Sequence, residues 1–489
     1  MQYLQNKEKH YVGIRETILY GIANGGQVMG YNLVRGQLTF YFVTVFGIPA
    51  EAVSTMILCM GIWDAINDPL MGSIVDRTRT RYGKLRPYLI FVPIPLAIMT
   101  ILLFGGAEFL SGVDSNITKI IYMYIVYFLW EFFYTIGDIP FWGLSAAISP
   151  LPSDRSAAIT SARLISSILG GLVSSMIPIF IDLSRNGIIP WDMKQVFLFM
   201  GCLAGILGTA LMSLSGLFTK ERVVQSNNEP SLFACFKYLF KNKPLLLIVL
   251  SNILATVEGI SGTFSQYFYI FSLGIASLSL VAGIPGTVTG FFSYLFIPTV
   301  ERRFSSKQIV VGCSLFNTAL AVVVFLIGSR YYTNAAVIVP LLAVQGIFTS
   351  AISSIKMVVP TKMIGDTVDY MEWKTGERNE GMSFSLLTFI SKLTGSLSTA
   401  MATAIMPLIH LQDVDLNNPV FPDTDINVRF WLWALMTAIP PILGLISLIP
   451  YAFYDLEGEK LEKIREEMRI HREMRTKAVS GDAGTATEE

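Results

Sequence analysis

The chain has 489 residues, of which 52% are apolar, 12% are aromatic and only 15% are charged. Soluble domains carry about 25% charged residues, so the composition argues against a water-soluble protein. The formal net charge is zero, and no nucleic-acid partner is indicated.

Apolar stretches long enough to cross a bilayer recur along the chain, since one helical crossing needs about 20 residues. Twelve spans are predicted, at residues 18–43, 52–75, 88–106, 119–148, 159–181, 195–218, 244–271, 279–300, 309–328, 335–359, 382–408 and 430–454. The polar start lacks the apolar run of a cleaved signal peptide. The sequence therefore predicts an all-α, multi-pass protein of the cell membrane, with the lipid bilayer as a partner.

Lys and Arg residues predict the orientation, because cationic loops stay on the cytoplasmic side. With both termini inside, the inner segments carry 27 of these residues and the outer loops carry four, Lys119, Arg185, Lys194 and Arg330. The long polar stretch 219–243 divides the spans six and six. We expect an N-terminal bundle at 1–218, a cytoplasmic linker at 219–243, a C-terminal bundle at 244–454, and a charged cytoplasmic helix with a disordered tail at 455–489.

Two aspartates, Asp64 and Asp68, lie one helical turn apart inside the second predicted span. Residues at i and i+4 share a helix face, so two ionised carboxylates there repel each other where water cannot solvate them. A proton on one carboxylate or a bound metal cation relieves the repulsion. Either answer predicts a site for a monovalent cation.

Other charged residues within spans mark a polar cavity, because each is costly in lipid unless it is paired, hydrated or functional. In the first half these residues are Arg35, Glu131, Asp138 and Arg163, and in the second half they are Glu258 and Lys392. The alternative interpretation is a set of fixed ion pairs that only specify helix packing. Trp142 shares a helix face with Asp138. Ordinary bundle packing is the default for an aromatic residue in a membrane span, and the neighbouring carboxylates give weight to the alternative of a ligand platform.

The predicted inner loops carry opposite charges that suit a gate. The candidates are Arg77, Arg81, Asp366, Asp369 and Glu372. The alternative is solvated charge that only sets the topology.

Enzymatic chemistry has no visible apparatus. The four cysteines are scattered, and the three histidines lie in the tails or at a helix end. No disulfide framework, metal cluster or nucleophile–base pair follows from these positions. The sequence predicts neither an enzyme nor a cofactor apart from a coupling ion.

Four runs carry a resemblance to a known family: Trp63–Gly72, Asp76–Pro87, Asp138–Trp142 and Gly365–Gly376. They resemble the glycoside-pentoside-hexuronide:cation symporter family, to which melibiose permease belongs. The resemblance extends from the first span to the charged C-terminal segment. It implies the major facilitator fold, with two pseudo-symmetric six-helix bundles and alternating access to a central site.

The resemblance also implies roles for particular residues. The family's cation site matches Asp64, Asn67, Asp68 and Thr135, with Asp64 and Asp68 as metal ligands if the ion is Na⁺. Its sugar site matches Asp138, Trp142 and Arg163, with Lys392 near the coupling site. Carboxylate and guanidinium groups suit this task because they form strong, directional hydrogen bonds with hydroxyls.

One departure from the family concerns the first span. Gln27-Val28 stands where melibiose permease has a lysine–aspartate pair that helps to hold galactosyl hydroxyls. An α-galactoside is therefore doubtful, and Gln27, Arg35 and Glu131 become candidate substrate contacts. The resemblance implies import of a xyloside, glucuronide or similar glycoside with Na⁺, H⁺ or Li⁺, by a protein expected to act as a monomer. A lysolipid or organic-anion carrier of the same fold is the alternative.

Overall fold

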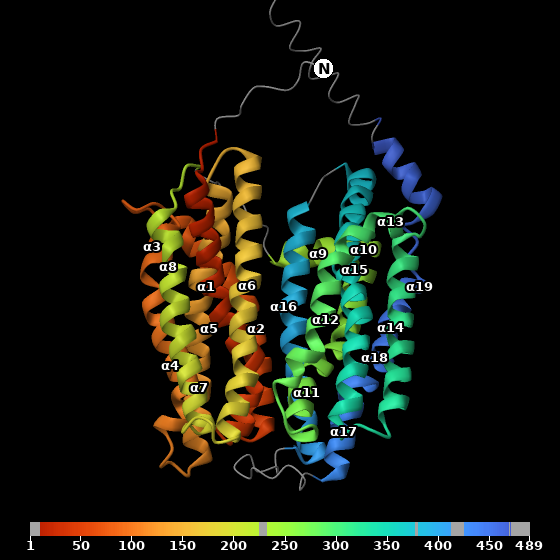
Figure 1. The fold of residues 1–489 in the computed structure, drawn as a ribbon. Coiled ribbons are helices and arrows are strands. Elements are labelled where there is room, and N and C mark those ends of the chain that lie inside the picture. The colour runs from red at the N-terminus through yellow and green to blue at the C-terminus, as the bar shows by residue number, and fades with distance from the viewer. Residues whose placement is uncertain (1–9, 224–231, 377–379, 412–424, 469, 471–489) are drawn as a thin grey trace, which may run out of the picture. The chain divides into compact units, whose positions relative to one another are not determined.

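The computed structural model describes residues 10–223, 232–376, 380–411, 425–468 and 470. Within these ranges the chain forms helices, and the only β-type pairing is an isolated bridge between Thr80 and Gly83 (Figure 1). The all-helical architecture predicted from the sequence is thus confirmed for the described residues.

The helices follow one another with short connections. In the first part of the chain they are α1 (Ile14–Thr39), α2 (Ala50–Arg77), α3 (Arg86–Phe91), α4 (Pro93–Phe109), α5 (Asn116–Ala147), α6 (Pro152–Arg185), α7 (Met193–Cys202) and α8 (Thr209–Phe218). In the second part they are α9 (Leu232–Lys241), α10 (Lys243–Leu254), α11 (Ile260–Tyr267), α12 (Leu278–Ser293), α13 (Ile297–Glu301), α14 (Ser306–Gly328), α15 (Ala335–Thr375), α16 (Glu380–Ile405), α17 (Ile426–Thr437), α18 (Ile439–Gly444) and α19 (Ile449–Ala452).

Short π and 3₁₀ segments interrupt or extend several of these helices. They are η1 (Phe40–Val45), η2 (Leu203–Gly208), η3 (Ala255–Gly259), η4 (Phe268–Ser272), η5 (Tyr294–Phe296), η6 (Pro407–Ile409) and η9 (Leu445–Leu448).

Eight helices of the described residues are long and apolar enough to span a membrane: Asn116–Ala147, Pro152–Arg185, Met193–Phe218, Lys243–Ser272, Leu278–Glu301, Ser306–Gly328, Ala335–Thr375 and Ile426–Ala452. Pro93–Phe109 is a shorter apolar helix. α1 and α2, with 26 and 28 residues, reach about 39 and 42 Å at 1.5 Å per residue, but they carry polar groups such as Gln27, Arg35 and Asp64. The total of twelve spans stays a prediction.

The chain divides into two compact units. The first consists of Met1–Asn228, Thr263–Leu280 and Thr399–Leu432. The second consists of Glu229–Gly262, Val281–Ser398 and Trp433–Glu489. The first division, after Asn228, falls within the predicted linker 219–243, and the domain limits drawn from the sequence stay predictions.

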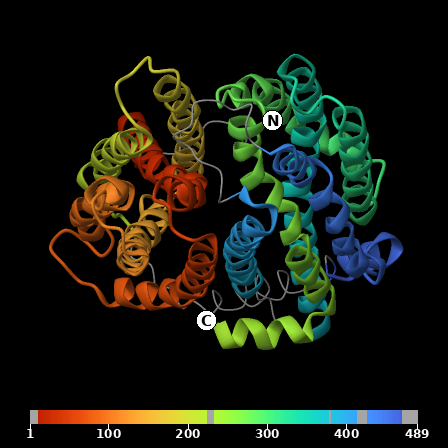
Figure 2. The same ribbon diagram turned by 90° about the horizontal axis from the view of Figure 1, so that it is seen from below.

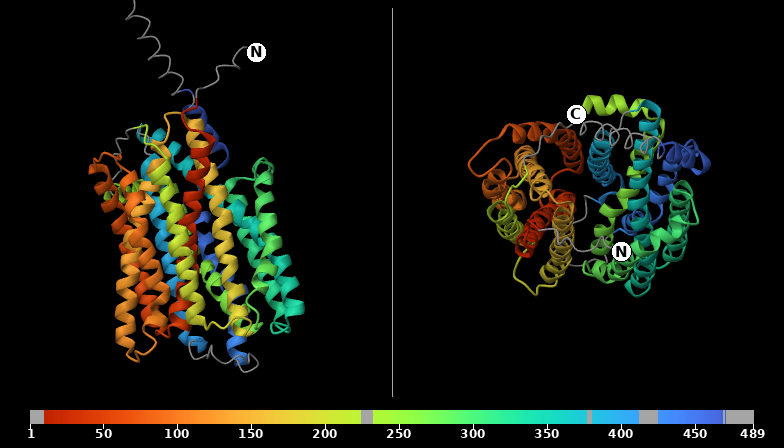
Figure 3. Two further views of the ribbon diagram at one scale, coloured as in Figure 1. Left: turned by 60° about the vertical axis from the view of Figure 1, so that its left-hand side comes forward. Right: turned by 90° about the horizontal axis from the view of Figure 1, so that it is seen from above.

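Close approach of helices organises the first unit, in which α1 packs against both α6 and α8. Figures 2 and 3 show α1, in red, beside the yellow α6. A Cβ atom on Gly26 of α1 would collide with the backbone carbonyl of Gly208. Small residues at such crossings let membrane helices come close enough for dense packing. The polar face of α1 is thereby held at a fixed position in the unit.

Polar contacts join the later segments of the first unit to its early helices. The carboxylate of Asp182 in α6 accepts hydrogen bonds from the backbone N–H groups of Ala276 at 2.7 Å and Ser277 at 2.8 Å. Ser54 of α2 donates to the carbonyl of Ala400 at 2.9 Å. These bonds explain why Thr263–Leu280 and Thr399–Leu432 belong to this unit.

An ion pair fixes the chain after α8. Arg222 donates to both carboxylate oxygens of Glu16, at 2.9 and 2.8 Å. This hydrogen-bonded pair raises the pKa of Arg222 above its usual value. The start of α1 and the end of the first six predicted spans are therefore tied together.

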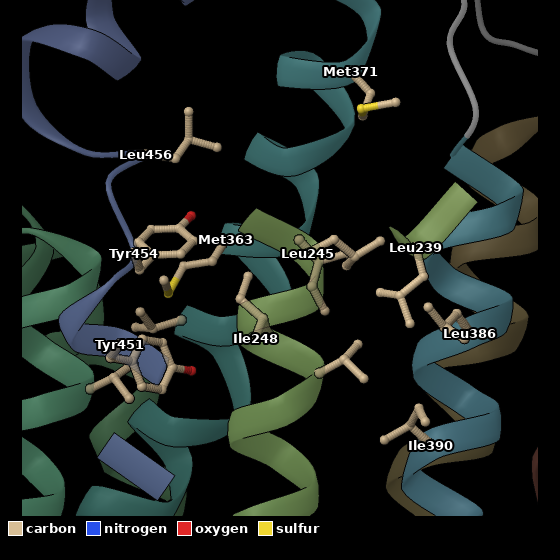
Figure 4. Close-up of a cluster of buried hydrophobic side chains, with 14 of the residues drawn as sticks. Leu239, Leu245, Ile248, Met363, Met371, Leu386, Ile390, Tyr451, Tyr454 and Leu456 are labelled. Atoms are coloured by element: carbon tan, nitrogen blue, oxygen red, sulfur yellow. The ribbon is translucent and has the colours of Figure 1, made fainter. Parts of the chain in front are cut away.

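A cluster of buried apolar side chains forms a core of the second unit, contributed by α9, α10, α15, α16 and the end of the chain (Figure 4). The helix over 458–468 belongs to this core, since Ile464 is 3% exposed and Met468 is 5% exposed. The sequence predicts a charged cytoplasmic helix here, and the structure shows that its apolar face is buried against its own unit. The tail expected to be disordered lies outside the described residues.

Candidate functional site

The predicted cation ligands lie on two neighbouring helices of the first unit. α2 carries Asp64, which is 5% exposed, and Asn67, which is 4% exposed. α5 packs along α2 and carries Thr135, which is 2% exposed. Asp68, one turn after Asp64, is half-buried. The chain thus buries carboxylate, amide and hydroxyl oxygens, the donors that hard cations such as Na⁺ prefer.

Among the described residues, no group of three or more His, Cys, Asp or Glu residues is placed to hold a metal. The predicted ligands Asp64, Asn67, Asp68 and Thr135 combine two carboxylates with an amide and a hydroxyl group. Such a mixed donor set suits a monovalent ion, which needs fewer charged ligands than a divalent metal.

Arg35 of α1 reaches both α2 and α5. Its Nη2 atom lies 2.9 Å from Oε1 of Glu131, which is buried in α5. The same nitrogen lies 3.8 Å from Oδ2 of Asp64. The guanidinium of Arg35 thus supplies part of the positive charge near Asp64. The sequence analysis assigned this charge to an ion from solution. Of these two acids, Glu131 is the nearer to the guanidinium.

The predicted sugar contacts on α1 and α5 are joined by a hydrogen bond. Gln27, which is buried in α1, donates from Nε2 to Oδ1 of Asp138 at 2.6 Å. The same nitrogen lies 3.4 Å from the hydroxyl oxygen of Tyr134. The residue that departs from the family pattern therefore contacts the acid that the resemblance assigns to the sugar.

Trp142 and Arg163 form a second pair beside the first. The guanidinium carbon of Arg163, on α6, lies 4.7 Å from the centre of the Trp142 ring, on α5. Such stacking holds a guanidinium in place while its N–H groups stay available for hydrogen bonds. Arg163 is exposed and Trp142 is half-buried. Because Trp142 and Asp138 are four residues apart on α5, both pairs serve one face of that helix.

A small cavity adjoins Gln27. It is lined by Gly26, Gln27, Gly30, Tyr31, Leu96, Thr100, Trp130, Tyr134, Ala204, Thr209 and Met212. Oε1 of Gln27 is buried there and has no hydrogen-bond partner within the described part of the chain. An amide oxygen in this position is an acceptor for a water molecule or a ligand hydroxyl.

Aromatic residues near this cavity escaped the sequence analysis. The ring of Tyr134 stacks on Trp130 with 5.1 Å between ring centres, and it lies 5.3 Å from the ring of Tyr31. A usable signal existed, since Tyr134 stands four residues before Asp138 and Trp130 four residues before Tyr134. Aromatic residues at this spacing are, however, common in any membrane bundle.

Lys392 lies on α16 in the second unit and is half-buried. The predicted cation ligands belong to the first unit. The proximity of Lys392 to them therefore stays a prediction.

The predicted gating residues are divided between the units. Arg77 ends α2, and Arg81 donates to the hydroxyl of Tyr82 at 2.8 Å, both in the first unit. Asp366 is 6% exposed in α15 of the second unit, where Arg465 donates to it at 2.6 Å. Asp369 and Glu372 follow on the same helix. The described partner of Asp366 is thus the C-terminal helix, and the gate itself stays a prediction.

Comparison with known proteins places this chain among transporters. Residues 19–458 match the family described as MFS/sugar transport protein. The "Uncharacterized symporter YjmB" of Bacillus subtilis is 30% identical, over 79% of this chain and 82% of its own length. The "Glucuronide carrier protein homolog" of Escherichia coli is 26% identical, over 91% and 93%. The "Isoprimeverose transporter" of Lactiplantibacillus pentosus is also 26% identical, over 94% and 91%.

Solved structures agree on the fold. The nucleoside transporter NupG superposes with a TM-score of 0.58 at 13% identity, covering 90% of this chain and 98% of its own. A D-xylose-proton symporter gives a TM-score of 0.54 at 14% identity, covering 89% and 96%. At this level of identity the likeness shows a shared fold.

These matches define a multi-pass transporter of the cell membrane rather than an enzyme. The chain belongs to the MFS/sugar transport family, and the resemblance to glycoside-pentoside-hexuronide symporters seen in its motifs is confirmed.

Proposed function

We propose that the chain imports a glycoside or oligosaccharide together with Na⁺ or H⁺ by alternating access. Xylosides and glucuronides are the favoured substrates, because the relatives include a glucuronide carrier homolog and an isoprimeverose transporter. The observation that carries the proposal is the convergence in one unit of the Gln27–Asp138 and Arg163–Trp142 pairs with the buried Asp64 of α2.

Each side chain has a role that its chemistry suits. Asp138 accepts hydrogen bonds from sugar hydroxyls and Arg163 donates them, because ionised groups form the stronger hydrogen bonds. Trp142 offers a flat apolar face to the ring. Gln27 holds Asp138 in position from α1. This set binds a neutral or anionic sugar without any covalent step.

The cation acts through Asp64 and Asp68, supported by Asn67 and Thr135. A ligand moves a conformational equilibrium only by its different affinities for the two states. Binding between α2 and α5 fixes the helix that also carries Asp138 and Trp142, so the cation tightens sugar binding. Linkage requires that sugar tightens cation binding by the same factor.

The membrane arrangement is part of the proposal. We infer twelve spans with both termini in the cytoplasm and a functional monomer. α1, α2, α4 and α16 supply the four spans beyond the eight that length and apolarity identify.

Uptake into membrane vesicles tests the proposal. Vesicles containing the protein receive 4-nitrophenyl β-xyloside, β-glucuronide or α-galactoside under an imposed Na⁺ gradient, an imposed pH gradient, or neither. At least one of the β-glycosides should accumulate under one gradient. Asp64→Asn should abolish the stimulation, whereas Asp114→Asn, in an exposed loop, should preserve it. Uptake that ignores both gradients contradicts coupling, and accumulation of lysolipid or organic anions instead favours the alternative carrier.

A further inference from the structure

A helix break in the second unit carries an acidic residue at membrane depth. The apolar stretch Lys243–Ser272 is 30 residues long, and within it α10 ends at Leu254 and the 3₁₀ segment η3 occupies Ala255–Gly259 before α11 begins. Glu258 lies in this break, near the middle of the stretch. Interrupted membrane helices free backbone groups, and in transporters such breaks mark binding sites.

Glu258 is paired with a lysine from another helix of the same unit. Nζ of Lys356, on α15, lies 3.0 Å from Oε2 and 3.3 Å from Oε1 of Glu258. Each side chain keeps 26% of its surface exposed. Charged groups exposed to hydrocarbon are strongly unfavourable, so such groups face a water-filled or polar space. The exposed part of this pair therefore indicates a hydrated recess.

Two glycines allow close approach at and beside this pair. A Cβ atom on Gly444 of α18 would lie 2.8 Å from Oε1 of Glu258. A Cβ atom on Gly259 would collide with the hydroxyl of Ser398 on α16. Both glycines are thus required by close approach, one beside the carboxylate and one beside a hydroxyl.

Hydroxyl groups around the break are buried without partners. Ser398 is 8% exposed and Thr256 is 6% exposed. Neither side-chain oxygen has a hydrogen-bond partner among the residues that the structure describes. Buried hydroxyls are nearly always paired. With Glu258 and Lys356, these groups offer donors and acceptors for a hydroxyl-rich ligand.

The pair repeats an arrangement found in the first unit. Arg35 and Glu131 join the first and fourth predicted spans, and Glu258 and Lys356 join the seventh and tenth, with the charges reversed. The two halves of major facilitator proteins are structural repeats. The pair in the second unit therefore occupies the same helices of its half as the pair beside the candidate cation site.

We propose that Glu258 and Lys356, with Thr256 and Ser398, form a second binding site for sugar hydroxyls in the second unit. The proposal rests on the proposed glycoside transport, and it assigns sugar contacts in the half where the predicted substrate contacts included only Lys392. Carboxylate and ammonium groups together bind the hydroxyls of a sugar ring by charge-assisted hydrogen bonds. The Glu258–Lys356 pair opens to admit the ligand and closes when it leaves.

Binding measurements on purified protein test this site. Binding of 4-nitrophenyl β-xyloside and 4-nitrophenyl β-glucuronide is compared in wild type, Glu258→Gln and the charge-swapped double variant E258K/K356E. Glu258→Gln should weaken the glycoside that wild type binds by at least tenfold. The swap should fold and keep its thermal stability while binding stays weak. Glu301→Gln is the matched control, because Glu301 pairs with Lys362 at the same distance of 3.0 Å in the same unit.

Thiol labelling gives a second readout, and protection is measured at a glycoside concentration high enough to saturate the weakened site. Glu258→Cys is introduced into a variant whose four native cysteines are replaced by serine. A charged, water-soluble thiol reagent should modify this cysteine, and the bound glycoside should slow the reaction at least threefold.

The outcomes separate the two proposals. Unchanged affinity in Glu258→Gln, affinity restored by the charge swap, or a cysteine that stays unlabelled overturns the second site and leaves a purely structural ion pair. A wild-type protein that binds neither glycoside overturns the proposed function itself, and the second site with it.

Discussion

Arg35 changes what the paired aspartates imply. A guanidinium 3.8 Å from Asp64 and 2.9 Å from Glu131 competes with any cation that arrives from solution. The shorter of the two contacts is with Glu131, and the longer one is with Asp64 of the candidate cation site. We therefore interpret Arg35 as an internal counter-charge that weakens cation binding without replacing it.

Arg35→Gln should raise the apparent affinity for the coupling cation by at least tenfold. The substitution removes the repulsion between the Arg35 guanidinium and the bound cation. Two unit charges about 4 Å apart interact by about 4 kcal/mol at an effective dielectric constant of 20. Cation-dependent tryptophan fluorescence of the purified protein measures the affinity. Glu131→Gln should lower it, since Arg35 then turns to Asp64. An affinity that is unchanged or lower in Arg35→Gln would contradict the interpretation.

Gln27→Leu should reduce sugar affinity about tenfold or more and leave cation binding in place. The substitution removes the donor that lies 2.6 Å from Asp138, and a hydrogen bond to a charged group contributes about 1.5–3 kcal/mol. The concentration dependence of glycoside uptake provides the measurement. Val28→Leu, at the next and half-buried position, is the control. Equal half-saturating glycoside concentrations in both variants would show that Gln27 does not contribute to sugar binding.

The close crossing of α1 and η2 fixes the position of α1 along its own axis, and with it the position of the polar residues that α1 carries. Gly26→Ala places a Cβ against the carbonyl of Gly208, and such overpacking costs about 1–3 kcal/mol. Thermal unfolding in detergent should shift to lower temperature. Gly36→Ala is the control on the same helix, because a Cβ there meets nothing within 4 Å. If both variants unfold at the same temperature, the close crossing does not limit stability.

The helix over 458–468 belongs to the second unit as a packed element. Ile464→Asp should destabilise that unit by about 3 kcal/mol or more, because it buries an unpaired charge in an apolar core. Lys463→Asp should be tolerated, since Lys463 is 76% exposed and its surface pair with Glu467 contributes little. The fraction of detergent-solubilised protein that stays monodisperse after heating measures the stability of the two variants. Similar melting of the two variants would show that the docked helix is dispensable.

The membrane orientation is a property of the whole molecule and can be measured directly. Single cysteines are placed at Asp114, Thr333, Lys220 and Glu459, all exposed, in a background without the native cysteines. An impermeant thiol reagent should label positions 114 and 333 in intact cells. Positions 220 and 459 should react only after permeabilisation, because cationic segments stay inside. The opposite pattern would invert the proposed topology.

Much of the candidate site was visible in the sequence. Asp64, Asn67 and Asp68 stand in one motif. Because they are separated by one helical turn or less, they lie close together however the rest of the chain folds. Asp138 and Trp142 are likewise four residues apart on α5. The helical period and the hydrophobic length of the spans are local properties, so a single sequence can specify them.

Contacts between helices far apart in the chain were decided by tertiary structure. Arg35 was recognised as an intramembrane charge, but its neighbours Glu131 and Asp64 depend on how α1 crosses α5 and α2. Glu258 was recognised as a charge within a span, and its partner Lys356 is brought to it by α15. The burial of Ile464 likewise follows from packing against distant helices.

The sequence by itself thus determined that the chain crosses the membrane repeatedly, transports rather than catalyses, and carries carboxylates within its predicted spans. Hydrophobicity, periodicity and charge are properties of short segments, and the cost of a charge in lipid needs no tertiary knowledge. Only the folded chain decided that Arg35 stands beside Asp64, that Gln27 bonds to Asp138, and that Lys356 pairs with Glu258. Helix crossings bring together residues more than a hundred positions apart, and the close packing at glycines that sets those crossings depends on all the helices at once.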